Sequence, residues 1–263
     1  MNAPDALPAF SNMDRERRFG GIARLYGEAA LETLKDARVC VVGIGGVGSW
    51  TAETLARSGV GRLRLVDLDH VSESNINRQI HALEPTLGQA KVQAMRERIG
   101  QIDAAIELDG IEDFLTADNA KEMLADCDVV VDAVDDVRAK LAMVLFCRDA
   151  GVELVVCGGA GGKVDPTRIH VEDLARTKQD PLLASLRRRL RAEHGYSRDP
   201  KRKFGIATVY SDEPLCRPQA ACGASAPQGL ACAGYGSSMA VTASFGLSAA
   251  AYVIDALVGR KAQ

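Results

Sequence analysis

The chain has 263 residues, of which 47% are hydrophobic and 25% are charged, and its formal net charge is −3. This balance is typical of a soluble globular protein of one large or two small domains. The slightly acidic total provides no overall attraction for nucleic acid, and the N-terminal residues lack the basic and apolar regions of a secretory signal peptide.

The predicted elements up to about residue 160 alternate between strands and helices, after a lead-in over residues 1–13 that we expect to be flexible. Apolar runs predict strands at 38–43, 62–67, 105–109, 128–133 and 152–158. Helical patterns occupy 27–37, 46–58, 88–102 and 137–150. This alternation predicts a doubly wound, Rossmann-like α/β fold with a mostly parallel sheet and right-handed crossovers.

The second half has a different character. It contains a predicted helix over 181–193, a strand over 201–211, an active-site loop over 214–231 and an apolar helix over 239–258. We expect one domain from residue 14 to 263, with a nucleotide-binding core over 14–160 and this extension over 161–263. The last helix is long enough to span a bilayer. However, Ser244, Ser248 and Asp255 interrupt it, which favours packing against the sheet over stable membrane insertion. Peripheral membrane association is left open.

Seven cysteines, an odd number without a secretion signal, indicate reduced thiols and a cytoplasmic protein. None of them forms a Cys-x-x-Cys pair, so a four-thiolate structural zinc site is not expected.

A glycine turn joins the first strand to the following helix. Gly43 permits the tight turn, Gly45 lets a phosphate approach the backbone, and Gly48 lets helix and strand pack closely. The helix start at Gly46 offers unpaired N–H groups to an anion. Asp67 ends the second strand, where a carboxylate accepts ribose hydroxyls. The alternative is a structural turn that binds nothing.

Cationic and polar side chains after the second strand favour ATP over NAD. Arg78, with Gln79 beside it, has a fork for phosphate oxygens, and Lys91 near a helix start provides a point charge. Asp135 follows the fourth strand, where an acid can hold Mg²⁺ between phosphates. Each has a structural alternative: a surface ion pair for Arg78, a solvated helix face for Lys91 and a helix N-cap for Asp135.

Together these residues resemble the adenylating domain of the E1-like superfamily, which activates ubiquitin-like and sulfur-carrier proteins. The matching residues are Gly43, Gly45, Gly46, Gly48, Asp67, Asp69, Asn75, Arg78, Gln79, Gly88, Lys91 and Asp135. The resemblance implies an ATP site in which Asp67 binds the ribose, Asn75, Arg78 and Lys91 bind phosphates, and Asp135 binds magnesium. It also implies a homodimer. Of the two N-terminal arginines that many members carry, only Arg18 matches, so the arginine that crosses the interface is not identified.

The second half resembles the tRNA threonylcarbamoyladenosine dehydratase branch of that superfamily, over residues 18–27, 74–83, 158–167, 173–182 and 241–246. The implied reaction is ATP-driven cyclisation of the threonylcarbamoyl group on adenosine 37 of tRNA. The first alternative is an adenylyltransferase for a ubiquitin-like sulfur carrier, although such enzymes usually hold zinc with two Cys-x-x-Cys pairs. The second alternative is an NAD-dependent oxidoreductase. A cysteine desulfurase or sulfur-acceptor protein is a further candidate partner.

The segment 176–203 holds ten Lys or Arg residues and three acids, a local charge of +7, and therefore predicts a tRNA contact. The alternative is a solvated amphipathic helix whose apolar face is Leu182, Leu183, Leu186 and Leu190.

Cys232 is a candidate acyl acceptor, because in E1-like relatives a cysteine after the adenylation domain can take the activated group. The alternative is a small buried residue, since intramolecular cyclisation does not require a thioester. Cys216 and Cys222 are weaker candidates in the same loop. His81 and His170 are available as acid–base groups, and the glycine run over 158–162 is interpreted as a turn. Arg78, Lys91, Asp135 and Cys232 are thus the candidate catalytic residues.

Overall fold

A single seven-stranded sheet organises the chain. The computed structural model describes residues 15–199, 201–216 and 235–259. The strand order is β3-β2-β1-β4-β5-β7-β6, and all neighbours are parallel except β6 and β7. The strands are β1 (Arg38–Val42), β2 (Arg62–Val66), β3 (Glu107–Ile111), β4 (Val129–Asp132), β5 (Glu153–Cys157), β6 (Ile169–Asp173) and β7 (Ala207–Ser211). The predicted doubly wound, mostly parallel fold is therefore confirmed.

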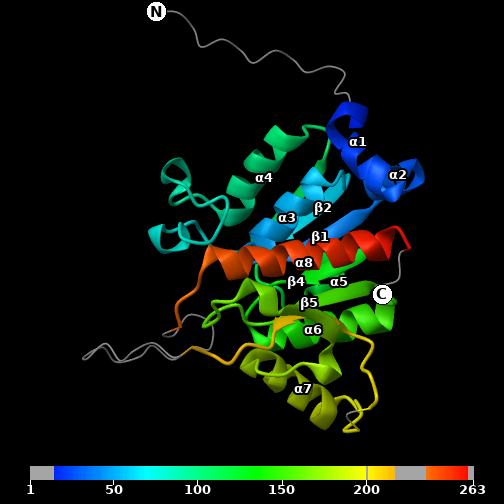
Figure 1. Ribbon diagram of the computed structural model, residues 1–263, viewed down its shortest axis with the longest axis vertical. Helices are drawn as coiled ribbons and strands as arrows, with labels where there is room; N and C mark the ends of the chain where they lie inside the picture. The colour runs from blue at the N-terminus through cyan, green and yellow to red at the C-terminus, as the bar shows by residue number, and fades with distance from the viewer. Residues whose placement is uncertain (1–14, 200, 217–234, 260–263) are drawn as a thin grey trace, which may run out of the picture.

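Helices cover both faces of the sheet (Figure 1). They are α1 (Arg15–Tyr26), α2 (Glu28–Asp36), α3 (Gly48–Arg57), α4 (Lys91–Ile102), α5 (Ala120–Leu124), α6 (Val137–Ala150), α7 (Pro181–Glu193) and α8 (Met239–Leu257). One apolar core joins the sheet to α3, α4 and α8, and the other joins it to α5, α6 and α7. Strands buried on both faces explain the continuous apolar runs that the sequence shows there.

Two predicted boundaries differ from the structure by three residues or more. Strand β7 begins at Ala207, six residues later than expected, because the carboxylate of Asp173 accepts hydrogen bonds from the backbone N–H groups of Phe204, Gly205 and Ile206. Helix α4 begins at Lys91, three residues later than expected. The preceding residues 88–90 instead pair with residues 70–71 in an extended conformation.

The C-terminal helix α8 lies across α3 and the sheet, as predicted. Among the described residues it is the one helix long and apolar enough to cross a membrane, and 50% of that window is buried. A side chain at Gly246 would meet the carbonyl oxygen of Val47 at 2.5 Å, and Thr51 donates a hydrogen bond to the Gly246 carbonyl. This close approach of α8 to α3 requires glycine at position 246.

Candidate nucleotide-binding site

The glycine turn lies at the carboxyl end of β1, between the neighbouring strands β2 and β4. Successive βα units run in opposite directions from this point, which is where doubly wound sheets bind ligands. Gly43 has φ = +88°, and a side chain there would meet the Ala133 carbonyl at 2.9 Å. The turn therefore packs directly against the end of β4 and requires glycine at this position.

Gly48 at the start of α3 touches the carbonyl oxygen of Gly43, and an added Cβ would lie 1.8 Å from that oxygen. We expect Gly48→Ala to lower the free energy of unfolding by about 1–3 kcal/mol, because backbone must move to admit the methyl group. Gly100 is the matched control, since it lies in α4 with no atom within 4 Å of an added Cβ. There, alanine should raise stability by about 0.5–1 kcal/mol. Urea unfolding measures both values, and equal effects would contradict the assigned packing role of Gly48.

Asp67 follows β2 and lies against the glycine turn. Its carboxylate accepts hydrogen bonds from the backbone N–H groups of Ile44 at 2.6 Å and Asp69 at 2.8 Å. Burial raises the pKa of this carboxyl group, and the nearby Lys91 ammonium opposes that rise. Asp67 thus connects the end of β2 to the turn, at the position predicted for a ribose contact.

Lys91 is directed into this site. Its ammonium lies 2.7 Å from the Asp69 carboxylate, and its side chain is only 7% exposed, whereas that of Asp69 is 59% exposed. The backbone N–H of Lys91 also donates to the Asp69 carbonyl at 2.9 Å. The alternative of a solvated helix face for Lys91 is therefore wrong, and the ammonium is held beside an exposed carboxylate at the sheet edge.

Asn75 ends a 3₁₀ turn (Glu73–Asn75), and Arg78 and Gln79 in the loop that follows it lie against the glycine turn. Asn75 is buried, and its side-chain oxygen accepts a hydrogen bond from the Ser72 backbone N–H. This contact shapes the loop, because the Asn75 carbonyl in turn accepts from the N–H groups of Arg78 and Gln79.

The Arg78 side chain packs over Gly46, where an added Cβ would lie 3.1 Å from its Cγ. Its guanidinium donates to the Ser74 carbonyl at 2.7 Å and the Asn77 side-chain oxygen at 2.9 Å, and it pairs with no carboxylate of the described chain. The surface ion pair is therefore wrong for Arg78. Gln79 is buried beside Gly45, and its Oε1 has no partner among the described residues.

Asp135 stands exposed in the loop after β4. Its neighbour Asp136 is the N-cap of α6, accepting from the N–H groups of Arg138 and Ala139, so the capping alternative for Asp135 is wrong. The Asp135 carboxylate accepts no hydrogen bond from the described residues, which leaves it free to face a ligand at the carboxyl edge of the sheet.

A buried ion pair beside this loop was not predicted from the sequence. Asp132 and Lys140 are both fully buried and 2.9 Å apart, and Lys140 also donates to the Cys157 carbonyl at 2.6 Å. Burial raises the pKa of Asp132, and Lys140 opposes the rise. A lysine within the otherwise apolar stretch 139–144 is the sequence signal that would have indicated it.

The glycine run over 158–162 turns the chain, as interpreted. The carboxylate of Asp180 accepts from the Gly159 N–H at 2.8 Å and caps α7. Gly162 donates to the Gly236 carbonyl and accepts from the Cys216 N–H, each at 2.8 Å. Buried Lys163 donates to the carbonyls of Gln179 and Glu213. These contacts join distant segments, so none of them was visible in the sequence.

Of the candidate cysteines, Cys222 and Cys232 lie outside the described residues. Cys216 is exposed at the edge of that gap. His81 is buried with neither ring nitrogen hydrogen-bonded in the described structure, and burial, with Lys91 and Arg98 nearby, lowers its pKa to about 4. His170 is half-exposed on β6, 3.5 Å from Asp212. Neither histidine is brought to the glycine turn by a contact that the structure records.

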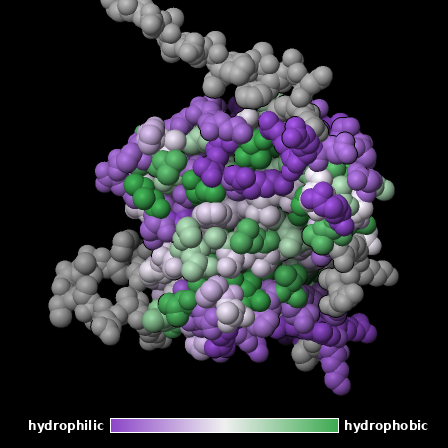
Figure 2. Space-filling model, turned by 45° about the horizontal axis from the view of Figure 1, so that its top comes forward, coloured by the Kyte–Doolittle hydropathy of each residue, from purple (hydrophilic) through white to green (hydrophobic). Residues whose placement is uncertain are grey.

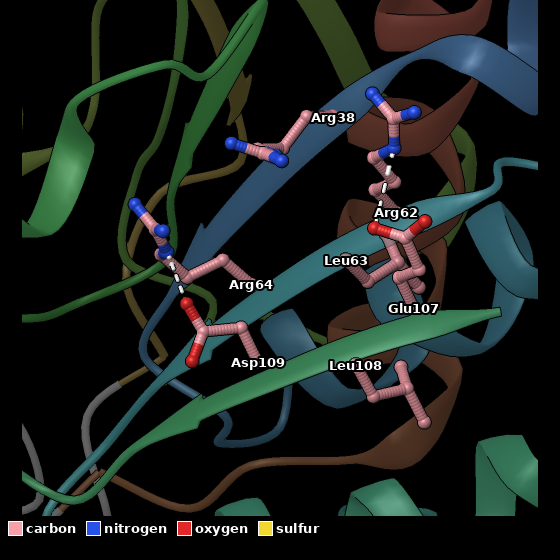
Figure 3. Close-up of a pocket in the computed structure, with 7 residues that line it drawn as sticks. All are labelled: Arg38, Arg62, Leu63, Arg64, Glu107, Leu108 and Asp109. Carbon is pink, nitrogen blue, oxygen red and sulfur yellow. Dashed lines mark hydrogen bonds and ion pairs between the residues drawn. The ribbon is translucent and has the colours of Figure 1, made fainter.

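A cavity of about 270 Å³ lies away from the glycine turn, at the amino ends of β1, β2 and β3 (Figure 3). Arg62 and Arg64 face it and pair across the strands with Glu107 at 3.3 Å and Asp109 at 2.7 Å. Arg64 also donates to the Met123 carbonyl at 2.9 Å. The cavity is therefore separate from the nucleotide site, and cross-strand ion pairs occupy two of the three arginines that line it, Arg62 and Arg64.

The basic segment 176–203 does not form one surface. Helix α7 buries Leu182, Leu183, Leu186 and Leu190 in the core, so it is the predicted amphipathic helix. Arg187 is partly buried and donates to the Thr177 hydroxyl, which makes it a structural residue. Arg176 and Lys178 are exposed, and they pair with Glu172 at 3.7 Å and Asp212 at 3.4 Å. The exposed cations that have no ion pair with the described residues lie farther along, from Arg188 onward.

The sheet order and the glycine turn at its reversal point define a doubly wound nucleotide-binding protein. The model of the ThiF family matches residues 20–263, and the chain belongs to that family. It is 46% identical to tRNA threonylcarbamoyladenosine dehydratase of Escherichia coli, over 94% of this chain and 96% of that protein. It is 44% identical to the Haemophilus influenzae protein of the same name, with coverage of 94% and 95%.

A solved structure agrees with the sequence comparison. The crystal structure of the E. coli dehydratase in complex with ATP superposes with a TM-score of 0.85, at 45% identity over 94% of this chain and 97% of that chain. The expected membership of the E1-like superfamily, with closest resemblance to the dehydratase branch, is thereby confirmed.

Proposed function

We propose that this protein is an ATP-dependent enzyme that dehydrates N6-threonylcarbamoyladenosine at position 37 of tRNA. The observation that carries the proposal is the near-complete match to dehydratases, one of them solved with ATP. The site supports it, because Asp67, Lys91 and Arg78 gather around one glycine turn. The alternative function, an adenylyltransferase for a ubiquitin-like carrier, is disfavoured because the chain matches the dehydratases over nearly its whole length.

The chemistry requires a carboxylate to become an electrophile. Transfer of AMP from ATP to the threonyl carboxylate, with release of pyrophosphate, or of a phosphoryl group, with release of ADP, turns one carboxylate oxygen into part of a good leaving group. A nitrogen or oxygen of the neighbouring carbamoyl group then attacks the carboxyl carbon, AMP or phosphate leaves with that oxygen, the carbamoyl group loses a proton, and a five-membered ring closes. No external acceptor is needed, so Cys232 is not required for turnover. The protein contributes orientation and charge stabilisation.

The residues of the site take the following roles in this proposal. Asp67 binds the ribose while its backbone contacts shape the turn, and the N–H groups at Gly45 and Gly46 receive phosphate. Arg78 and Lys91 offset charge that develops on the phosphates, with Asn75 and Gln79 holding the loop over the turn. Asp69 keeps the Lys91 ammonium in place until a phosphate competes for it.

Magnesium fits the donor set around Asp135. Mg²⁺ at nucleotide sites is commonly held by one or two carboxylates, water and substrate phosphates, and Asp135 is an exposed carboxylate without a hydrogen-bond partner in the described chain. Within the described residues no three His, Cys, Asp or Glu side chains cluster as a metal cage, so phosphates would complete the coordination. Bound magnesium supplies charge neutralisation on the phosphates.

One face of the molecule carries an exposed apolar band. Figure 2 shows a pale to hydrophobic band between hydrophilic regions, and Met239 and Leu247 on α8 are 49% and 47% exposed. We infer that a second copy of the chain covers this band in a homodimer.

We also propose that the protein acts in the cytoplasm, where its tRNA resides. A cysteine desulfurase or sulfur-acceptor protein is a further proposed partner.

The decisive experiment follows the mass of the nucleoside. The protein is incubated with ATP, magnesium and tRNA that carries the threonylcarbamoyl group, and the RNA is digested for mass spectrometry. The expected result is loss of one water from the modified nucleoside, dependent on ATP. An unchanged nucleoside, with pyrophosphate exchange that appears only when a carrier protein is added, would establish the adenylyltransferase alternative.

A further inference from the structure

Four cations lie in the loop that follows the far end of α7, and we call them the distal basic patch. Its members are Arg198, Lys201, Arg202 and Lys203. All four are exposed, and their side chains form no ion pair or hydrogen bond with the described residues. The nearest acid in sequence, Asp199, has its carboxylate engaged by the Lys201 backbone N–H at 2.9 Å. Unpaired cations in one short loop favour a polyanion as the partner.

The loop that carries the patch is held in shape by buried contacts. The rings of Tyr196 and Phe204 stack edge to face at 4.9 Å, and the Arg191 guanidinium lies 5.3 Å from the Phe204 ring centre. Asp173 accepts from the N–H groups of Phe204 and Gly205 at 2.8 and 2.7 Å. Both ends of the loop that carries the cations are therefore anchored to the core, which lowers the entropy cost of binding.

The patch and the nucleotide site lie at opposite edges of the sheet. Helix α7 starts at the carboxyl edge, where Asp180 accepts a hydrogen bond from the Gly159 N–H. It runs back to the amino edge, because the loop that follows it leads into the first residue of β7, parallel to β5. Its 13 residues span about 20 Å, so the loop that carries the patch lies about that far from the carboxyl edge, where the nucleotide site is.

We propose that the distal basic patch binds phosphates of the paired anticodon stem of tRNA, while the loop carrying adenosine 37 enters the nucleotide site. This inference rests on the proposed function. A reactive base must be presented from a single-stranded loop, whereas a duplex is recognised through its backbone. A contact about 20 Å from the reactive base therefore falls beyond the loop. The patch thus provides sequence-independent affinity for tRNA, and the reaction takes place at the nucleotide site on the opposite edge of the sheet.

The test combines a protein variant with a shortened RNA. Arg198→Glu/Arg202→Glu is compared with Lys121→Glu/Arg96→Glu, which makes the same change in net charge at exposed positions of α5 and α4. Binding is measured for the anticodon stem-loop with a full stem and with a stem cut back from its open end. The patch variant should bind the full hairpin about tenfold or more weakly, and its slope of log affinity against log salt should fall by about two.

The test asks whether the charge reversal in the protein and the shortening of the RNA stem remove the same contact. For the wild-type protein, shortening the stem should weaken binding, and for the patch variant it should change little. Equal losses on both hairpins, or a loss no larger than in the control variant, would overturn the stem contact and favour an acidic protein partner. The nucleoside mass assay on wild-type protein separates this failure from a failure of the proposed function. Matching thermal unfolding midpoints show that each variant is folded.

Discussion

Arg78→Met should lower kcat/KM for the tRNA dehydration by about 10³-fold, which is the usual effect of removing a group that stabilises charge in the transition state. The side chain packs on Gly46 and pairs with no carboxylate of the described structure, so its charge is available to phosphate. The measurement is steady-state kinetics of the mass change, together with ATP-induced stabilisation of the folded protein.

Two further variants decide whether the effect belongs to the site. Arg96→Met removes an exposed cation from α4 and should leave kcat/KM unchanged. Arg78→Lys keeps the charge and loses the fork, so it should fall between Arg78→Met and wild type. Unfolding in the absence of ATP should change by less than about 0.5 kcal/mol for Arg96→Met, because Arg96 is exposed, and by about 0.5–1.5 kcal/mol for Arg78→Met, which loses the hydrogen bonds to Ser74 and Asn77. Full activity of Arg78→Met would remove the phosphate role.

Lys140→Met should lower the free energy of unfolding by about 3–5 kcal/mol, because it leaves the Asp132 carboxylate buried without its counterion. The lost hydrogen bond to the Cys157 carbonyl adds to that cost. Urea unfolding at neutral pH measures the change.

The double variant Asp132→Asn/Lys140→Met is the control for this pair. It contains neither buried charge, so it should recover most of the stability that Lys140→Met loses. If the double variant is as unstable as the single variant, the loss comes from packing of the lysine stem and the ion-pair explanation is wrong.

Elements with local signals were predictable from the sequence. The bounds of α6 and α7 match the prediction, since Asp136 and Asp180 cap their first turns and Gly151 ends α6 in a left-handed conformation. By contrast, β6 has an exposed, charged sequence and gains its strand conformation from pairing with β7. Tertiary pairing of this kind leaves no periodic signal in the strand itself.

The site was predictable where one loop supplies the chemistry. Arg78 and Gln79 lie on the glycine turn, as their order in the chain indicated. The roles assigned to them stay predictions. Contacts such as Lys163 with Glu213, 50 residues apart, arise only when the sheet has assembled, so their partners were not visible in the sequence.

The position of α8 has a consequence for biosynthesis. Residues of this helix fill the core between α3 and the sheet, and Thr242 would lie 3.4 Å from a side chain at Gly46 in the turn. Residues 239–257 are synthesised after all seven strands of the sheet, so the nascent chain exposes the apolar surface of β1 and α3 until α8 has been made. The surroundings of the glycine turn are accordingly completed only when α8 packs, and products shortened before residue 239 are candidates for chaperone binding and proteolysis.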